Sequence, residues 1–160
     1  MKEMLEISAR LPEIRFAAGD VIVTEGASAA GIWILVSGAL SVRKGSELVN
    51  AVNRPGALVG EISVLLGTPY SATVEAATFS VLRHADDGHA FLIDNPDIMR
   101  HVAVGLAERL NFVTTYLADL KHQYGDAPGL AMVSDVLNQL AQRQVPPARP
   151  GSARDPNPEY

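Results

Sequence analysis

Residues that could hold a small anionic ligand are concentrated between positions 59 and 74. Gly60 precedes a short, mostly apolar stretch, Glu61 to Leu66, which predicts about one turn of helix. The first N–H groups of a helix have no intrahelical acceptor and favour an anion placed before them. Ser71 follows after a Gly-Thr-Pro turn and adds a hydroxyl. The segment therefore predicts a cradle for a small, negatively charged group.

An all-β pattern surrounds this segment. Between Phe16 and Ala85, short runs rich in Val, Ile, Leu and Thr are separated by closely spaced glycines, which is typical of a compact antiparallel β-roll, a barrel or jelly roll. No long helix separates the runs, so a parallel βαβ architecture is excluded. A strand is expected to end at Val59, and the others are Asp20 to Thr24, Ile32 to Ser37, Ala39 to Lys44, Glu47 to Asn53, Ser71 to Ala76 and Phe79 to His84.

Helical patterns flank the β-rich region. Residues 3–11 have apolar side chains at helical spacing, and Pro12 is expected to end that helix. Residues 86–93 predict a short helix, and the sequence from Asn95 to Asp97 predicts the N-terminus of a long one. The last helical pattern covers residues 130–144. The expected fold is therefore mainly β, with an N-terminal helix, a short helix at Glu61 and a long C-terminal helix.

The long helix carries two apolar stripes. Two stripes need two surfaces, so we expect one to pack on the β-roll and the other to pack on the same helix of a second subunit, giving a homodimer. The alternative is one wide core stripe within a single chain. The first stripe is a heptad seam of Met99, Ala103, Leu106, Leu110, Val113, Leu117, Leu120 and Tyr124, and the second is Ile98, Val102, Gly105, Phe112 and Tyr116.

The predicted organisation is one β domain with appendages. Residues 1–13 form the N-terminal helix, and residues 14–124 form the β domain together with the dimerisation helix, 96–124. Residues 125–145 form an extra helix, and residues 146–160 form a proline-rich tail that is expected to be disordered. One helix and a tail after Gly125 leave no recognition helix, so we expect no helix-turn-helix and no DNA binding by the chain itself.

Composition argues against several classes of function. The 160 residues carry a net charge of −5, which disfavours a broad nucleic-acid surface, and the absence of cysteine excludes disulfides and thiolate chemistry. Acids occupy the N-terminus where a signal peptide is apolar, and no apolar run reaches the ~18 residues of a membrane span. We therefore expect a cytoplasmic protein with no membrane contact. No hydrolase-type nucleophile motif is present, so no enzyme activity is expected.

One cluster of metal-type side chains is present, His84, Asp86, Asp87 and His89. It lies where a predicted strand meets a predicted helix, and the simplest role of Asp86 or Asp87 there is to cap the helix. Two histidines this close in sequence are common without a metal. No metal site and no cofactor are therefore expected.

Residues 14–124 resemble the cyclic nucleotide-binding domain of catabolite activator proteins, kinase regulatory subunits and cyclic nucleotide-gated channels. Residues 19–26 and 31–38 are similar to the first strand pairs of that family, with their turn glycines. Residues 55–56, 59–64 and 69–74 are similar to its phosphate-binding cassette. The resemblance implies a regulatory module that binds cyclic AMP or cyclic GMP in a β-roll and signals through the long helix to a protein partner.

The resemblance also implies a role for each residue of the cassette. Gly60 would let the backbone approach the cyclic phosphate, and Glu61 would accept a hydrogen bond from the ribose 2′-hydroxyl. Ile62 and Ser63 would offer backbone N–H groups, and Ser71 its hydroxyl and N–H. The alternative for Glu61 is an acid that only stabilises the N-terminus of its own helix.

Tyr70 departs from the family pattern, because this position is typically an arginine that grips the phosphate. Losing a hydrogen bond to a charged group costs about 1.5–3 kcal/mol, or roughly ten- to more than hundred-fold in affinity. Tyr70 would either donate one neutral hydrogen bond or fill the pocket with its ring. The second case predicts a degenerate domain that serves as a protein-interaction or dimerisation adaptor.

Three arginines near the cassette and two threonines on the long helix have open roles. Arg43, Arg54 and Arg83 either reach the phosphate from neighbouring strands or are solvated surface charges. The resemblance implies that Thr114 or Thr115 meets an edge of the base. The alternative is that both threonines are polar residues on an exposed helix face.

Overall fold

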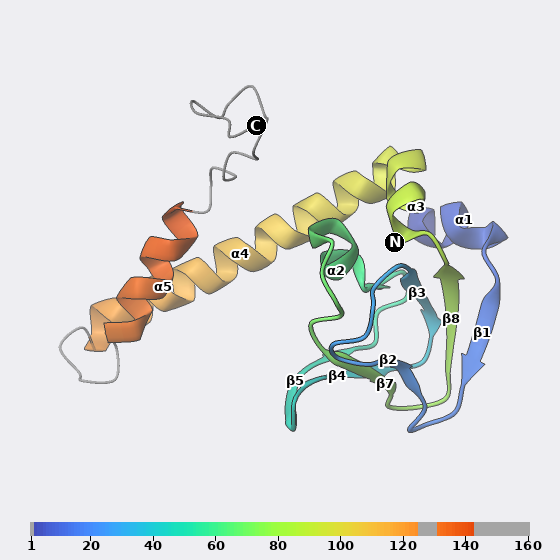
Figure 1. The fold of residues 1–160 in the computed structure, drawn as a ribbon, viewed down its shortest axis with the longest axis horizontal. Coiled ribbons are helices and arrows are strands. Elements are labelled where there is room, and N and C mark those ends of the chain that lie inside the picture. The colour runs from blue at the N-terminus through green and yellow to red at the C-terminus, as the bar shows by residue number, and fades with distance from the viewer. Residues whose placement is uncertain (1, 125–130, 143–160) are drawn as a thin grey trace, which may run out of the picture. The chain divides into compact units, whose positions relative to one another are not determined.

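The structure is a computed structural model that describes residues 2–124 and 131–142 (Figure 1). It divides into two compact units, Met1–Ala103 and Val104–Tyr160, and each is considered by itself. The predicted tail, residues 146–160, lies outside the described residues, as do parts of the predicted segment 125–145.

The first unit contains two four-stranded sheets, and the strand pairs among its described residues are antiparallel. This confirms the predicted antiparallel β-roll. The first sheet has the order β1-β8-β3-β6, with β1 at Glu13–Phe16, β8 at Ser80–Ala85, β3 at Ile32–Ser37 and β6 at Leu58–Val59. The second has the order β2-β7-β4-β5, with β2 at Val21–Val23, β7 at Thr73–Ala76, β4 at Leu40–Lys44 and β5 at Glu47–Val52.

The hydrophobic core of the first unit is built from both sheets. Its fully buried members include Leu35 of β3 and Leu40 of β4, each with no exposed surface. Alternate residues of a strand face opposite sides, so each sheet turns one apolar face toward the cluster. The core cluster is Val23, Leu35, Leu40, Val59, Val74 and Leu82.

The helices lie where the sequence predicts them. The N-terminal pattern forms α1, Lys2–Ile7, followed by the 3₁₀ turn η1, Ser8–Arg10. The short helix α2 is Glu61–Leu66, α3 is Gly88–Asp94, α4 is Pro96–Tyr124 and α5 is Ala131–Gln142. Among the described residues, none of these helices is both long enough and apolar enough to span a bilayer.

Strand β1 was missed by the sequence analysis. Its residues, Glu-Ile-Arg-Phe, are mostly exposed and carry two charges, so no alternating apolar pattern marks them. The strand exists because it pairs with β8, with Glu13 opposite Arg83 and Phe16 opposite Ser80. Strand β7 begins at Thr73 and not at Ser71, because the backbone of Tyr70 bonds to Gly26 and Ala27 instead.

The two stripes of α4 have different exposures along the helix. At its start, Ile98 and Val102 of the second stripe are buried, with 1% and 5% of their surface exposed. Further on, Phe112 of the same stripe is 71% exposed, and Leu110 of the heptad seam is 51% exposed. The second stripe is therefore covered within this chain only at its beginning.

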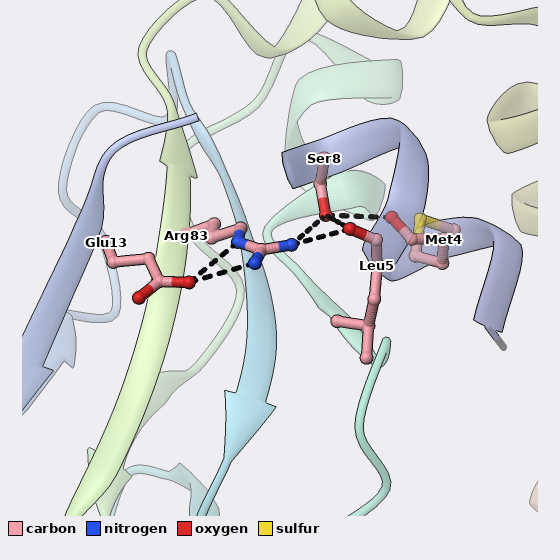
Figure 2. A network of polar contacts seen from close by, with 5 residues as sticks. All are labelled: Met4, Leu5, Ser8, Glu13 and Arg83. Carbon is pink, nitrogen blue, oxygen red and sulfur yellow. Dashed lines mark hydrogen bonds and ion pairs between the residues drawn. The ribbon is translucent and has the colours of Figure 1, made fainter. Parts of the chain in front are cut away.

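Arg83 fastens the N-terminal helix to β8 (Figure 2). Its guanidinium donates to the carbonyl oxygen of Leu5 at 2.6 Å, to Ser8 Oγ at 3.3 Å, and to Glu13 Oε1 at 2.9 and 3.1 Å. Only 14% of the Arg83 side chain is exposed. The interpretation of Arg83 as a solvated surface charge is therefore wrong, because its donors are used to hold α1 and β1 against β8.

We expect Arg83→Met to lower the free energy of unfolding by about 2 kcal/mol, since charge-assisted hydrogen bonds contribute about 1.5–3 kcal/mol each and this group is partly exposed. Urea unfolding measures the loss. Arg15→Met, at an exposed residue of the neighbouring strand β1, is the matched control and should change stability by less than about 0.5 kcal/mol. Equal losses in the two variants would contradict a specific role of Arg83.

Candidate functional site

The predicted cradle is a turn between β6 and α2. Strand β6 ends at Val59, Gly60 takes the left-handed conformation with φ of +92°, and α2 begins at Glu61. Positive φ favours glycine because a Cβ atom is disfavoured there. Gly67 ends the helix, also at positive φ, with its N–H donated to Val64. Residues 59–74 are called the cassette below. Its turn and its helix are as the sequence predicted, whereas the strand expected from Ser71 begins at Thr73.

The polar residues of the cassette differ in exposure. Glu61 and Ser63 are buried, with 7% and 2% of their surface exposed. Ile62 is 36% exposed, and Ser71 is exposed. Burying a carboxylate costs free energy, and an exposed acid would stabilise the N-terminus of α2 without that cost. Glu61 also has an interaction within the chain, which offsets that cost.

Tyr70 occupies the position that the family gives to an arginine. Its hydroxyl donates to the carbonyl oxygen of Gly31 at 3.1 Å. Burial raises the pKa of Tyr70, and Trp33 and the bond to Gly31 act in the opposite direction. The tyrosine is therefore neutral and directed toward β3.

The ring of Tyr70 packs on the edge of the hydrophobic core and against Gly60. A Cβ atom added to Gly60 would lie 2.9 Å from Tyr70 Cε1 and 3.0 Å from the Gly31 oxygen. Contacts within the chain therefore require a glycine here, independently of any ligand. The sequence analysis offered the ligand as the reason for Gly60, and the close approach of Tyr70 is a second reason that it missed.

The expected metal-type cluster has structural partners. Asp87 caps α3 by accepting the N–H of Ala90 at 2.9 Å, as predicted for one of the two aspartates. His84 Nδ1 lies 2.8 Å from Asp86 Oδ1, and its ring is stacked on Trp33 with centroids 3.9 Å apart. Within residues 2–124 and 131–142, no three such side chains form a group that could hold a metal ion.

A cavity of about 450 Å³ lies where the cassette helix meets the start of α3. It is separate from the residues of the predicted phosphate cradle, because neither Gly60 nor Ser71 contributes to its walls. The lining residues are Ala29, Ala30, Val64, Asp86, Asp87 and His89.

Arg43, Thr114 and Thr115 are among the residues that the sequence analysis offered for ligand contacts. Arg43 contacts Glu75 at 3.8 Å and donates to the Ser46 carbonyl at 3.2 Å. Thr114 is half-buried and Thr115 is exposed, and both belong to the second unit. Their contact with a base therefore stays a prediction.

Comparisons with known proteins identify sequences and structures that are similar to this chain. Residues 13–89 match the family model of the cyclic nucleotide-binding domain. The catabolite activator protein of Thermus thermophilus has a similar structure, with a TM-score of 0.59 and 21% sequence identity over 91% of this chain and 85% of that one.

Two further solved structures are similar. One, described as belonging to a cyclic-GMP-dependent signalling pathway that regulates bacterial phytopathogenesis, has a TM-score of 0.58 and 25% identity over 69% of this chain and 94% of its own. The other is PKAR CBD2 with Sp-2Cl-cAMPS bound, with a TM-score of 0.54 and 22% identity over 68% of this chain and 75% of its own. Residues 13–89 are therefore identified as a cyclic nucleotide-binding domain by their match to the model of that family.

Proposed function

We propose that this chain is a non-catalytic, cytoplasmic regulatory module that binds a cyclic nucleotide, or a related small anion, at the cassette and signals through α4. The observation that carries the proposal is the placement of Glu61, a residue only 7% exposed, at the start of α2 and directly after the left-handed Gly60. A carboxylate acceptor beside the N–H groups at the start of a helix suits a ligand that presents a hydroxyl next to an anion.

In this proposal each residue of the cradle has one task. Glu61 accepts a hydrogen bond from the ribose 2′-hydroxyl, and the backbone N–H groups of Ile62 and Ser63 face the phosphate. Gly60 gives the phosphate access to the backbone. Ser71 is exposed, so its hydroxyl is available to a ligand from solution.

Position 70 of the cradle carries a tyrosine in place of the arginine that the resemblance implies, and this lowers the expected affinity for a nucleotide. The Tyr70 hydroxyl already donates to the Gly31 oxygen, so it has no second proton to offer a phosphate. The missing charge-assisted bond corresponds to affinity that is about ten- to a hundred-fold weaker than an arginine would give.

Isothermal titration with cyclic AMP and cyclic GMP tests the proposal, and we expect Glu61→Gln to weaken binding by at least about tenfold, because the amide is a poorer acceptor than the carboxylate. Glu47→Gln, at an exposed acid of β5, is the matched control and should bind as the wild type does. If neither nucleotide gives heat at about 100 μM protein, the proposal is wrong for both ligands.

We expect Tyr70→Arg to strengthen nucleotide binding by about tenfold or more, because a guanidinium supplies the missing bidentate contact. The same titrations measure the gain. Tyr70→Lys separates geometry from charge, since a lysine brings the charge without the planar fork. Equal or weaker binding by Tyr70→Arg would show that no phosphate lies within reach of position 70.

We also propose that the heptad seam of α4 forms a homodimer. Leu110 and Val113 of the seam are 51% and 45% exposed in the single chain, and apolar residues at a and d positions are covered in coiled coils by a second helix. A dimer would give the signal a route from one copy to another.

We expect Leu110→Glu to convert the dimer to a monomer, because a charge at a seam position would be buried without a partner. Sedimentation equilibrium measures the mass. Asn111→Glu, one residue away and off the seam, is the control and should remain dimeric. A wild-type chain that is monomeric at tens of micromolar would contradict the seam as an interface.

A degenerate adaptor without nucleotide binding is the second candidate. The observation that favours it is Tyr70, whose ring packs beside Gly60 while its hydroxyl is already bonded to Gly31. The titrations distinguish the two functions, since a module that has lost its ligand gives no heat with either nucleotide in the wild type.

A further inference from the structure

We propose that Tyr70 is a positioning residue that couples the cassette to the start of α3, through the loop of residues 24–31 and through the side chains of Trp33, His84 and Asp86. This set of contacts is called the Tyr70 junction. The inference deepens the proposed function by giving the same site a means of regulation. The part that concerns the ligand rests on that function, and the part that concerns the junction does not.

The first route runs through the loop between β2 and β3. Tyr70 holds this loop at three points: its N–H donates to Ala27 at 2.9 Å, its carbonyl accepts from Gly26 at 2.8 Å, and its hydroxyl donates to Gly31 at 3.1 Å. The same loop is bonded to α3, because the N–H of Gly88, the first residue of that helix, donates to the Ala30 oxygen at 2.8 Å. One short loop therefore joins Tyr70 to α3.

The second route runs through side chains across the sheet. Trp33 and Tyr70 both pack against the core cluster, and Trp33 lies opposite His84 in the pairing of β3 with β8. The two rings are stacked at 3.9 Å with 20° between their planes. His84 in turn bonds to Asp86 at 2.8 Å, two residues before α3 begins. Both routes start at Tyr70 and end within three residues of each other.

Close packing leaves the junction little freedom to absorb a displacement. A Cβ atom on Gly31 would collide with His84 Nε2, and one on Gly88 would lie 2.8 Å from Ile32 Cγ1 and 3.0 Å from Val64 Cγ2 of α2. With Gly60 against Tyr70, three glycines let the cassette, the loop and α3 approach one another this closely. Because packed interiors transmit strain, a shift of Tyr70 is passed on to α3.

The proposed ligand contacts lie directly beside Tyr70. Gly60 touches the ring of Tyr70, and Ser71 follows it in the chain. A phosphate bound by these two residues displaces Tyr70 or holds it in place, and either effect reaches Gly88 by the routes above. The hydroxyl of Tyr70 thus contributes to the response and is not itself a ligand of the phosphate.

Amide hydrogen exchange of the unliganded protein tests the junction. We expect Tyr70→Phe to speed exchange at Gly88 by about tenfold, the change that corresponds to loss of about one net hydrogen bond at the far end of the loop. Amides of the β3–β8 ladder should keep their rates. Tyr116→Phe, at an exposed tyrosine of α4, is the matched control. An unchanged rate at Gly88, or equal acceleration throughout the ladder, would overturn the inference.

Emission from Trp33 gives an independent readout, because it is the only tryptophan in the sequence. We expect Tyr70→Phe and His84→Leu each to change the emission spectrum, since each removes a group in contact with the indole, while Tyr116→Phe leaves it unchanged. Identical spectra for Tyr70→Phe and the wild type would contradict the coupling between Tyr70 and Trp33 on which the second route depends.

Exchange measurements with cyclic AMP distinguish the proposed function from the proposed role of the Tyr70 junction. At cyclic AMP concentrations that saturate each protein, the wild type should change its exchange rate at Gly88, and Tyr70→Phe should lose this response. If both respond equally, the junction does not carry the signal although the proposed function stands. If titration shows no binding of cyclic AMP to the wild type, the proposed function fails, and the exchange of the unliganded proteins alone decides the junction.

Discussion

The antiparallel pairing of β3 with β8 is the constraint on which the rest of the first unit depends. Its register places Trp33 opposite His84 and Ile34 opposite Arg83. Adjacent residues of a strand point to opposite faces, so His84 and Arg83 serve different surroundings. His84 stacks on Trp33 near the cassette, while Arg83 binds α1 and β1. A slip of one residue would exchange these two roles and break both sets of contacts.

The cassette shows how a family backbone can persist while its chemistry changes. The turn at Gly60, the short helix and the return toward β7 are all in place, and the acid at position 61 is buried. At position 70 an aromatic ring has replaced the charge of the family pattern, and it is bound by the chain itself. The ligand proposed above would meet a site that is already organised but has no cation at position 70.

The sequence by itself was sufficient wherever local rules govern the backbone. Helix α2 covers the predicted residues, Glu61–Leu66, because glycine turns bound it on both sides. Strand β3 has the predicted bounds because Gly31 and Gly38 enclose a continuous apolar run. Helix α4 begins at Pro96, the expected first helical position. The cap at Asp87 follows the same logic, since a side chain bonding three residues ahead needs no tertiary contact.

Only the tertiary structure decided the contacts between residues far apart in the sequence. Arg83 is bonded to residues that lie 70, 75 and 78 positions away in the sequence, one of them in strand β1. The bond from Tyr70 to Gly31 spans 39 positions. No periodicity or capping rule specifies such pairs, because they follow from sheet register and from the space left by glycines. The sequence could therefore state that Tyr70 departs from its family, but the folded chain alone shows where its hydroxyl is directed.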